Sequence, residues 1–255
     1  MSESVASMSS LRRCVERLEG RRAPGMTARF ATGHEGIDSW LGGGLAQGRL
    51  HELIAAGEDA GCGAGFAAML AMLAGGGRPL LWLRTDNAQR RCGRLQATGL
   101  GELGVAGGML LLGLVADEAA LLNASADAAR CAGLGAVLVE CWGRSRLLDL
   151  TATRRLMLAA EASGVTMLLL RIAGEEMPSA AETRWRVAPS PSTPLPDGSS
   201  CGAPGHPMFD VELLRRRAGP AGRAWRLEWD RDRKSFRAPP GEPALSGAVL
   251  PVAAG

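Results

Sequence analysis

The chain has 255 residues and almost no lysine, because Lys234 is its only one and every other basic residue is arginine. A GC-rich coding bias is one explanation of this preference, since Ala and Gly are also abundant. Its consequence is chemical. Any site whose chemistry depends on a lysine has a single candidate in the whole chain.

The spacing of a metal site is also missing. The three histidines are scattered, and no two cysteines form a C-x-x-C pair. Cys131 and Cys141 border an apolar run, where a buried reduced thiol is expected. The cysteines occupy positions 14, 62, 92, 131, 141 and 201. We therefore expect neither a metal nor another cofactor.

No basic-then-apolar signal peptide opens the chain, and no apolar run approaches the roughly 18 residues that span a bilayer. We expect a cytoplasmic protein without a membrane partner. The net charge of +3 permits contact with nucleic acid but does not require it. The 46% hydrophobic content is enough for one large core.

Apolar runs alternate with helical candidates between about residues 30 and 170. Most runs are continuously apolar, which is typical of strands buried on both faces. The predicted strands are Leu50–Ala55, Pro79–Arg84, Met109–Leu114, Ala136–Glu140 and Val165–Arg171. The predicted helices are Ala64–Ala74, Asp86–Gln96, Asp117–Cys131 and Leu148–Ser163, the last ending at Gly164. This alternation predicts an α/β fold with a mostly parallel central sheet flanked by helices.

The remaining segments suggest a core with two tails. Residues 1–29 are predicted to be a tail with a short amphipathic helix, and residues 237–255 a flexible tail. The core, 30–236, includes a Pro-, Ser- and Gly-rich stretch at 188–207 that we expect to be a mobile loop. Alternating residues at 208–215 and 223–229 predict a C-terminal β-hairpin extension.

The stretch that begins at Thr32 resembles the opening of the RecA/RadA core. That family enters its ATPase domain with Thr-Gly, a glycine-rich turn and then Gly-Arg-hydrophobic-x-Glu-hydrophobic. Here the match runs from Thr32 through Gly48, Arg49, Glu52 and Ile54. It implies a RecA-like core.

A degenerate phosphate loop follows at Ala56–Phe66. It has glycines at the expected density (Gly57, Gly61, Gly63 and Gly65) but no Gly-Lys-[Ser/Thr]. In such loops the lysine reaches the β- and γ-phosphates and the hydroxyl holds Mg²⁺. Glu58 and Asp59 add negative charge. Backbone amides at a helix N-terminus still allow weak nucleotide binding, but efficient turnover is not expected.

Glu140 ends a buried run at the position of a Walker B carboxylate. One interpretation is that it faces a metal. The other is a structural role in a salt bridge or a helix cap, and the missing lysine favours this second interpretation.

The chain as a whole resembles the ImuA family of bacterial mutagenesis-cassette proteins over about residues 30–230. The most specific blocks are the Leu-Thr-Ala…Arg-Arg-Leu…Ala-Ala-Glu-Ala-Ser-Gly segment and Thr-Arg-Trp-Arg-Val. The residues that carry the resemblance are Thr32–Gly33, Gly42–Leu45, Gly48–Leu53, Ala64–Phe66, Leu81–Trp82, Leu147–Gly164, Thr183–Ser190 and Trp225–Asp230.

The resemblance implies a non-catalytic accessory protein in error-prone DNA synthesis after damage. The implied partners are ImuB, a Y-family polymerase homologue, and a DnaE-type polymerase, with RecA and a second copy of the chain as further candidates. Two alternatives stay open. One is a divergent DNA-stimulated ATPase that uses Glu140, and the other is a cell-division inhibitor similar to SulA, a relative with the RecA fold.

Two surfaces are candidates for partner contact. Leu11, Val15 and Leu18 form one apolar stripe on the N-terminal helix, which packs either on a neighbouring molecule or on its own core. Arginines of the hairpin are the candidates for contact with DNA or an acidic partner; the alternative is a solvated strand face with Trp225 and Trp229 in the core. They are Arg215, Arg216, Arg217, Arg223 and Arg226.

Overall fold

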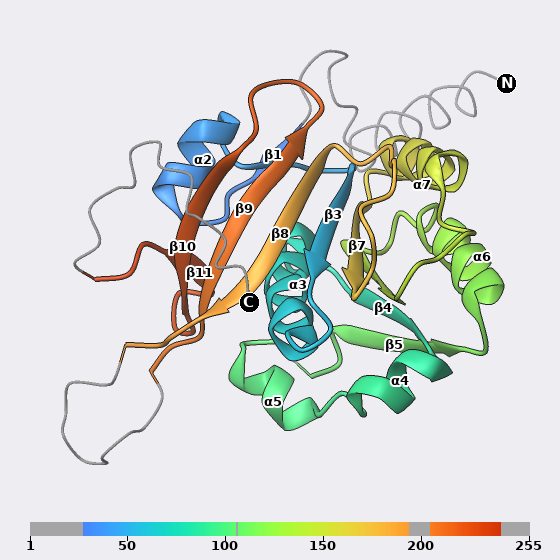
Figure 1. Ribbon diagram of the computed structural model, residues 1–255, viewed down its shortest axis with the longest axis horizontal. Coiled ribbons are helices and arrows are strands. Elements are labelled where there is room, and N and C mark those ends of the chain that lie inside the picture. Colours follow the sequence, from blue (N-terminus) through green and yellow to red (C-terminus); the bar gives the residue numbers. More distant parts are fainter. Residues whose placement is uncertain (1–27, 106, 194–204, 241–255) are drawn as a thin grey trace, which may run out of the picture.

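A computed structural model describes residues 28–105, 107–193 and 205–240 (Figure 1). They form a nine-stranded sheet in the order β11-β10-β9-β8-β3-β7-β6-β4-β5 and a small sheet of β1 and β2. The strands are β1 (Arg29–Phe30), β2 (Leu45–Ala46), β3 (Leu50–Ala55), β4 (Leu80–Thr85), β5 (Leu110–Val115), β6 (Ala136–Trp142), β7 (Thr166–Ile172), β8 (Thr183–Ser190), β9 (Met208–Arg216), β10 (Arg223–Asp230) and β11 (Ser235–Arg237). The helices are α2 (Glu35–Leu41), α3 (Ala60–Gly75), α4 (Asp86–Cys92), α5 (Ala97–Glu102), α6 (Glu118–Ala128) and α7 (Leu150–Ser163).

The central sheet is parallel from β8 to β5, and β8 through β11 are joined antiparallel. The predicted α/β class with a mostly parallel sheet is therefore confirmed. The five predicted strands agree with β3 to β7 to within two residues at each end, and β9 and β10 form the predicted hairpin. Residues 1–27, which include the apolar stripe of Leu11, Val15 and Leu18, lie outside the described residues.

Side-chain caps explain why two helices start later than predicted. Asp149 accepts a hydrogen bond from the Ala152 amide, so α7 begins at Leu150, and Asp117 caps α6 in the same way. Gly164 ends α7 with a positive φ of 78°, as predicted. The helix predicted over 86–96 stops at Cys92, because Gly93 leaves the helical region at φ 79° and ψ −178°. The short elements α2, α5, β1, β2 and β11 were not predicted.

The predicted loop at 188–207 was wrong at its start, because β8 continues to Ser190. Ala188, Pro189 and Ser190 pair with β9 alone, whereas β3 pairs with β8 only as far as Arg186. A proline is compatible with a strand whose second edge is open, since its missing N–H costs no ladder bond there. Residues 194–204 lie outside the described part of the chain.

Helices cover both faces of the central strands. Leu53 of β3 packs in the core formed with α3, and Leu50 packs in the core formed with α6 and α7 (Figure 1). α3 consists of apolar and small residues throughout, and part of the extension also packs against it. Phe66 of α3 packs on Phe209 of β9 and Phe236 of β11, with ring centroids 5.3 and 5.1 Å apart.

A buried charge cluster joins β3, β7 and β8. Glu52 is 0% exposed, and its two oxygens accept hydrogen bonds from Nε of Arg171 (2.5 Å), Nε of Arg184 (2.6 Å) and the hydroxyl of Ser179 (2.7 Å). Because the carboxylate faces two guanidinium groups, its desolvation is offset by paired charge. Through Ser179, the segment between β7 and β8 is thereby held against β3. No helix of the described residues is both long and apolar enough to cross a membrane.

His51 links the small sheet to the large one. Its Nε2 lies 2.8 Å from the Ala46 carbonyl oxygen, and its Nδ1 lies 2.7 Å from the Thr183 hydroxyl. A carbonyl only accepts, so Nε2 carries the proton, and Nδ1 accepts from Thr183. Burial lowers the pKa of His51 to about 4. The ring is therefore neutral in the folded protein.

This depressed pKa predicts acid sensitivity. Between pH 6.5 and about 4 the unfolded chain binds a proton at this histidine that the folded chain does not, so stability falls as the pH falls through this window. We expect the free energy of unfolding of the native chain to drop by about 3 kcal/mol more than that of His51→Gln between pH 7 and pH 4. Urea denaturation at several pH values measures this difference. Parallel pH profiles of the two proteins would contradict the assignment. His34, whose pKa burial also lowers, is present in both.

Candidate functional site

The degenerate phosphate loop lies between β3 and α3. α3 begins at Ala60, four residues before the predicted start, and the helix therefore contains Gly61, Gly63 and Gly65. Gly57 alone of the four glycines lies in the connection. The predicted loop is thus mostly the first two turns of a helix.

Gly63 occupies the position where a phosphate-binding loop has its lysine. Counting Gly-x-x-x-x-Gly-Lys-[Ser/Thr] from Gly57 places Cys62, Gly63 and Ala64 at the last three positions. A Cβ added at Gly63 would lie 2.6 Å from the Cβ of Ala55. The absence of a side chain at this position is therefore a packing requirement of α3 on β3.

The charge around this helix start is negative. Glu58 is exposed, Asp59 precedes the helix, and Asp59 makes no side-chain cap. Burial, reinforced by Asp59 and Asp210, raises the pKa of the Cys62 thiol to about 12. The negative charge that disfavours a thiolate at Cys62 would also repel a polyphosphate bound at the same place.

The single lysine of the chain is remote from this place. Lys234 lines a pocket with Met72, Gly76 and Val105, at the C-terminal end of α3. Thirteen residues of helix separate Gly63 from Gly76, a distance of roughly 20 Å. A lysine side chain does not bridge that distance, so in this structure it cannot supply the missing group.

Glu140, at the Walker B position, is 1% exposed and fully engaged. Its Oε1 accepts from Arg84 (2.9 Å) and from the Trp142 indole (3.2 Å), and its Oε2 accepts from the Trp82 indole (3.0 Å). The Cys92 thiol lies 3.4 Å from Oε1. The structure thus places Glu140 in a buried salt bridge. Among the described residues, no three His, Cys, Asp or Glu side chains gather as ligands for a metal.

Sequence reasoning missed the partners of Glu140. A signal was available: Arg84 is a charged residue near the end of an apolar strand, and parallel strands end at the same edge of a sheet. Arg171, near the end of β7, carries the same signal, whereas Arg184 lies at the start of β8. Each of these arginines is buried because a carboxylate lies on a neighbouring strand.

The structure does not bring the five predicted hairpin arginines into one patch. Arg216 donates to the carbonyls of Trp40 and Leu41 and caps α2. Arg223 stacks over Trp40, with its guanidinium carbon 4.7 Å from the ring centroid. Arg226 pairs with Asp210 on the strand face opposite α3. The indoles of Trp225 and Trp229 are buried, as the structural alternative predicted.

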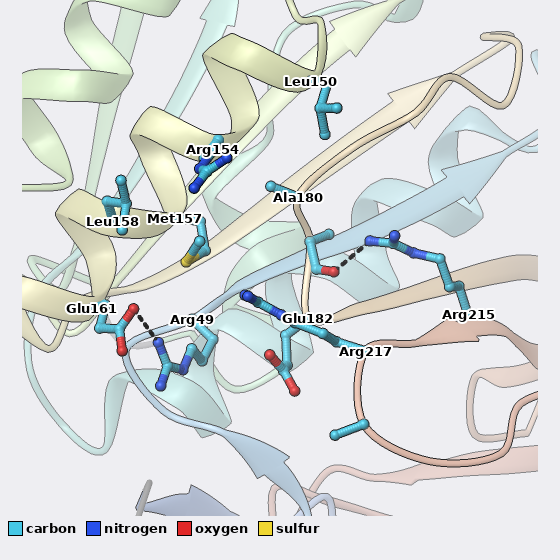
Figure 2. A pocket seen from close by; sticks show the side chains of 12 residues that line it. Arg49, Leu150, Arg154, Met157, Leu158, Glu161, Ala180, Glu182, Arg215 and Arg217 are labelled. Carbon is cyan, nitrogen blue, oxygen red and sulfur yellow. Dashed lines mark hydrogen bonds and ion pairs between the residues drawn. The ribbon is translucent and has the colours of Figure 1, made fainter. Parts of the chain in front are cut away.

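Arg215 and Arg217 do come together, in a pocket of about 700 Å³ (Figure 2). Arg49, which precedes β3, and Arg154 of α7 line the same pocket. The pocket lies at the starts of β3 and β8, and the phosphate loop follows the end of β3. The two places therefore lie at opposite edges of the sheet.

The glycines of α3 give a matched test of the packing. Gly63→Ala should lower the free energy of unfolding by about 1–3 kcal/mol, because the added methyl overlaps Ala55. Gly65→Ala should raise it by about 0.5–1 kcal/mol, because nothing lies within 4 Å of the added Cβ and alanine favours a helix. Denaturant titrations measure both changes. If Gly63→Ala were as stable as Gly65→Ala, the packing role of Gly63 would be wrong.

The chain is similar to two curated proteins. They are Protein ImuA from two strains of Caulobacter vibrioides, each 35% identical over 225 residues that cover 82% of this chain and 86% of the relative. A scan against protein-family models gave no match.

A solved structure is similar in fold. The crystal structure of the RadB recombinase aligns with a TM-score of 0.53 at 15% sequence identity, covering 82% of this chain and 99% of RadB. At this identity the likeness establishes the fold alone, and it confirms the RecA-like core that the sequence predicted. With the identity to both ImuA proteins over most of its length, the chain belongs to the ImuA family.

Proposed function

We propose that this chain is a non-catalytic RecA-like accessory protein of the bacterial DNA-damage response. It acts as an adaptor in an error-prone translesion synthesis complex with an ImuB-type Y-family polymerase homologue and a DnaE-type polymerase. RecA is a further candidate partner. Membership of the ImuA family and the RecA-like fold support this assignment.

The observation that carries the non-catalytic part is the state of Glu140. A carboxylate that holds Mg²⁺ must offer a lone pair to the metal, whereas Glu140 is buried and accepts from Arg84 and two indoles. Releasing it would leave Arg84 buried and without its counterion. Chemistry that needs a free carboxylate here is therefore opposed by the folded structure itself.

The loop side supports the same proposal. Gly63 leaves no room for the lysine, and Ala64 provides no hydroxyl for Mg²⁺. Transition-state charge on a transferring phosphoryl group would meet Glu58 and Asp59 instead of a cation. A RecA-like fold that has lost these parts retains its surfaces, and an adaptor works through its surfaces.

Equilibrium binding of a fluorescent ATP analogue with Mg²⁺ tests the proposal. We expect no saturable binding at millimolar nucleotide and no hydrolysis with or without single-stranded DNA. A RecA-family ATPase measured in parallel serves as the positive control. Tight binding with DNA-stimulated turnover would overturn the proposal and favour the divergent ATPase, with Glu140 as the first residue to substitute.

A further inference from the structure

We propose that the pocket between α7 and the end of β9 binds an acidic peptide segment with apolar side chains, supplied by a partner protein. We call it the α7–β9 pocket. It is lined by Arg49, Leu150, Arg154, Met157, Leu158, Glu161, Ala180, Ala181, Glu182, Arg215, Arg217 and Ala218. The inference rests on the proposed adaptor role and names one surface that would serve it.

The α7–β9 pocket carries a net positive charge, and not all of its arginines are in close ion pairs. Four arginines and two glutamates line it, and Arg49 pairs with Glu161 at 2.6 Å. No hydrogen bond or ion pair joins the side chain of Arg154 or Arg217 to another described residue. Glu161 lies close enough to feel the charge of Arg217, but it is already paired with Arg49. The four arginines of this concave site therefore outnumber its two glutamates, and this excess favours a carboxylate ligand.

Arg215 is held so that the pocket keeps its shape. Its NH2 group donates to the carbonyls of Ser179 and Ala181, at 2.8 and 2.6 Å. Ser179 is in turn bound to Glu52, so the wall is anchored in the buried charge cluster. The Nε of Arg215 is buried and has no hydrogen-bond partner among the described residues. This wall of the pocket is therefore pre-formed.

The opposite wall is formed by α7 and carries apolar side chains beside its charged ones. Leu150 and Leu158 of α7 are 51% and 52% exposed, and Met157 lies beside them (Figure 2). Together with Arg154 and Glu161 they form one stripe along the helix at spacings of three and four residues. This stripe is roughly 16 Å long, the length of about five residues of extended peptide. Apolar side chains of such a peptide would cover the leucines while its carboxylates meet the arginines.

The same features argue against nucleic acid as the occupant. No aromatic residue lines the pocket, so bases have no stacking platform. Glu161 and Glu182 would face the phosphates, and the exposed leucines would remain uncovered. The first 27 residues of the chain carry five arginines and three glutamates, so a basic pocket favours an acidic segment over them.

Fluorescence polarisation of a labelled peptide of about eight residues, alternating Glu and Leu, tests the proposal on the full chain. We expect saturable binding that Arg154→Glu with Arg217→Glu weakens at least about tenfold, because both charges are reversed. Arg155→Glu is the matched control: it lies on the same helix, is exposed and does not line the pocket. Leu158→Ser should also weaken binding, and Leu147→Ser, exposed outside the pocket, should not.

Three outcomes would overturn the inference. They are no saturable binding up to about millimolar peptide, equal losses in Arg155→Glu and in the pocket variant, or displacement of the peptide by a single-stranded oligonucleotide through the same arginines. None of these outcomes depends on whether the chain binds ATP. If the peptide test fails and the chain also binds no nucleotide, the adaptor proposal stands and only the assignment of this pocket is wrong.

Discussion

The buried carboxylate of Glu52 is the interaction on which the rest of the structure depends. It sits on β3 between β7 and β8 and receives Arg171, Arg184 and Ser179 together. Removing the carboxylate would leave two buried guanidinium groups unpaired, which costs far more than the pair contributes. The cluster fixes the neighbours of β3. Ser179 also accepts a hydrogen bond from Arg215 through its carbonyl oxygen. The same cluster therefore stabilises both the order of the strands and one wall of the α7–β9 pocket.

The two ends of the parallel strands differ in how their charged residues are used. At the end where RecA-like proteins bind phosphate, the positions of the Walker A lysine and the Walker B carboxylate are occupied by residues with packing and salt-bridge roles. Gly63 lets α3 approach β3, and Glu140 neutralises Arg84. At the other end of the strands, the side chains of Arg154 and Arg217 make no hydrogen bond or close ion pair with a described residue. The excess of positive charge thus lies in the α7–β9 pocket and not beside the degenerate phosphate loop.

Much of the fold followed from periodicity. Continuous apolar runs located β3 to β7, and alternation located the hairpin. The start of α3 was misplaced because the glycines at positions 61, 63 and 65 have low helix propensity and their density resembled a phosphate loop. The contacts of Glu140 with Trp82 and Arg84 join residues 58 and 56 apart along the chain. A charged residue near a strand end was the local signal, but only the order of the strands in the sheet decides which of these residues pair.

The pocket shows the same limit. Arg215 and Arg217 were recognisable as a basic run, but their neighbours Arg49 and Arg154 come from the residue before β3 and from α7. Their convergence depends on β8 lying beside β3 and on α7 covering that face. Arg216 and Arg223 contact α2 instead, and strand alternation sends Arg216 to the face opposite its neighbours Arg215 and Arg217. Arg226 lies farther along the sheet, where it pairs with Asp210.

The most direct test of the account compares the two edges in cells. Damage-induced mutation frequency would be measured in a bacterial strain that lacks the chain and carries either Gly61→Glu or Arg154→Glu with Arg217→Glu, with protein levels checked by immunoblot. Gly61 is exposed and open space surrounds it, so the glutamate blocks residual phosphate binding without disturbing the fold. The account predicts that Gly61→Glu supports mutagenesis as the native chain does and that the pocket variant does not. The reverse result, loss with Gly61→Glu and full mutagenesis with the pocket variant, would contradict it.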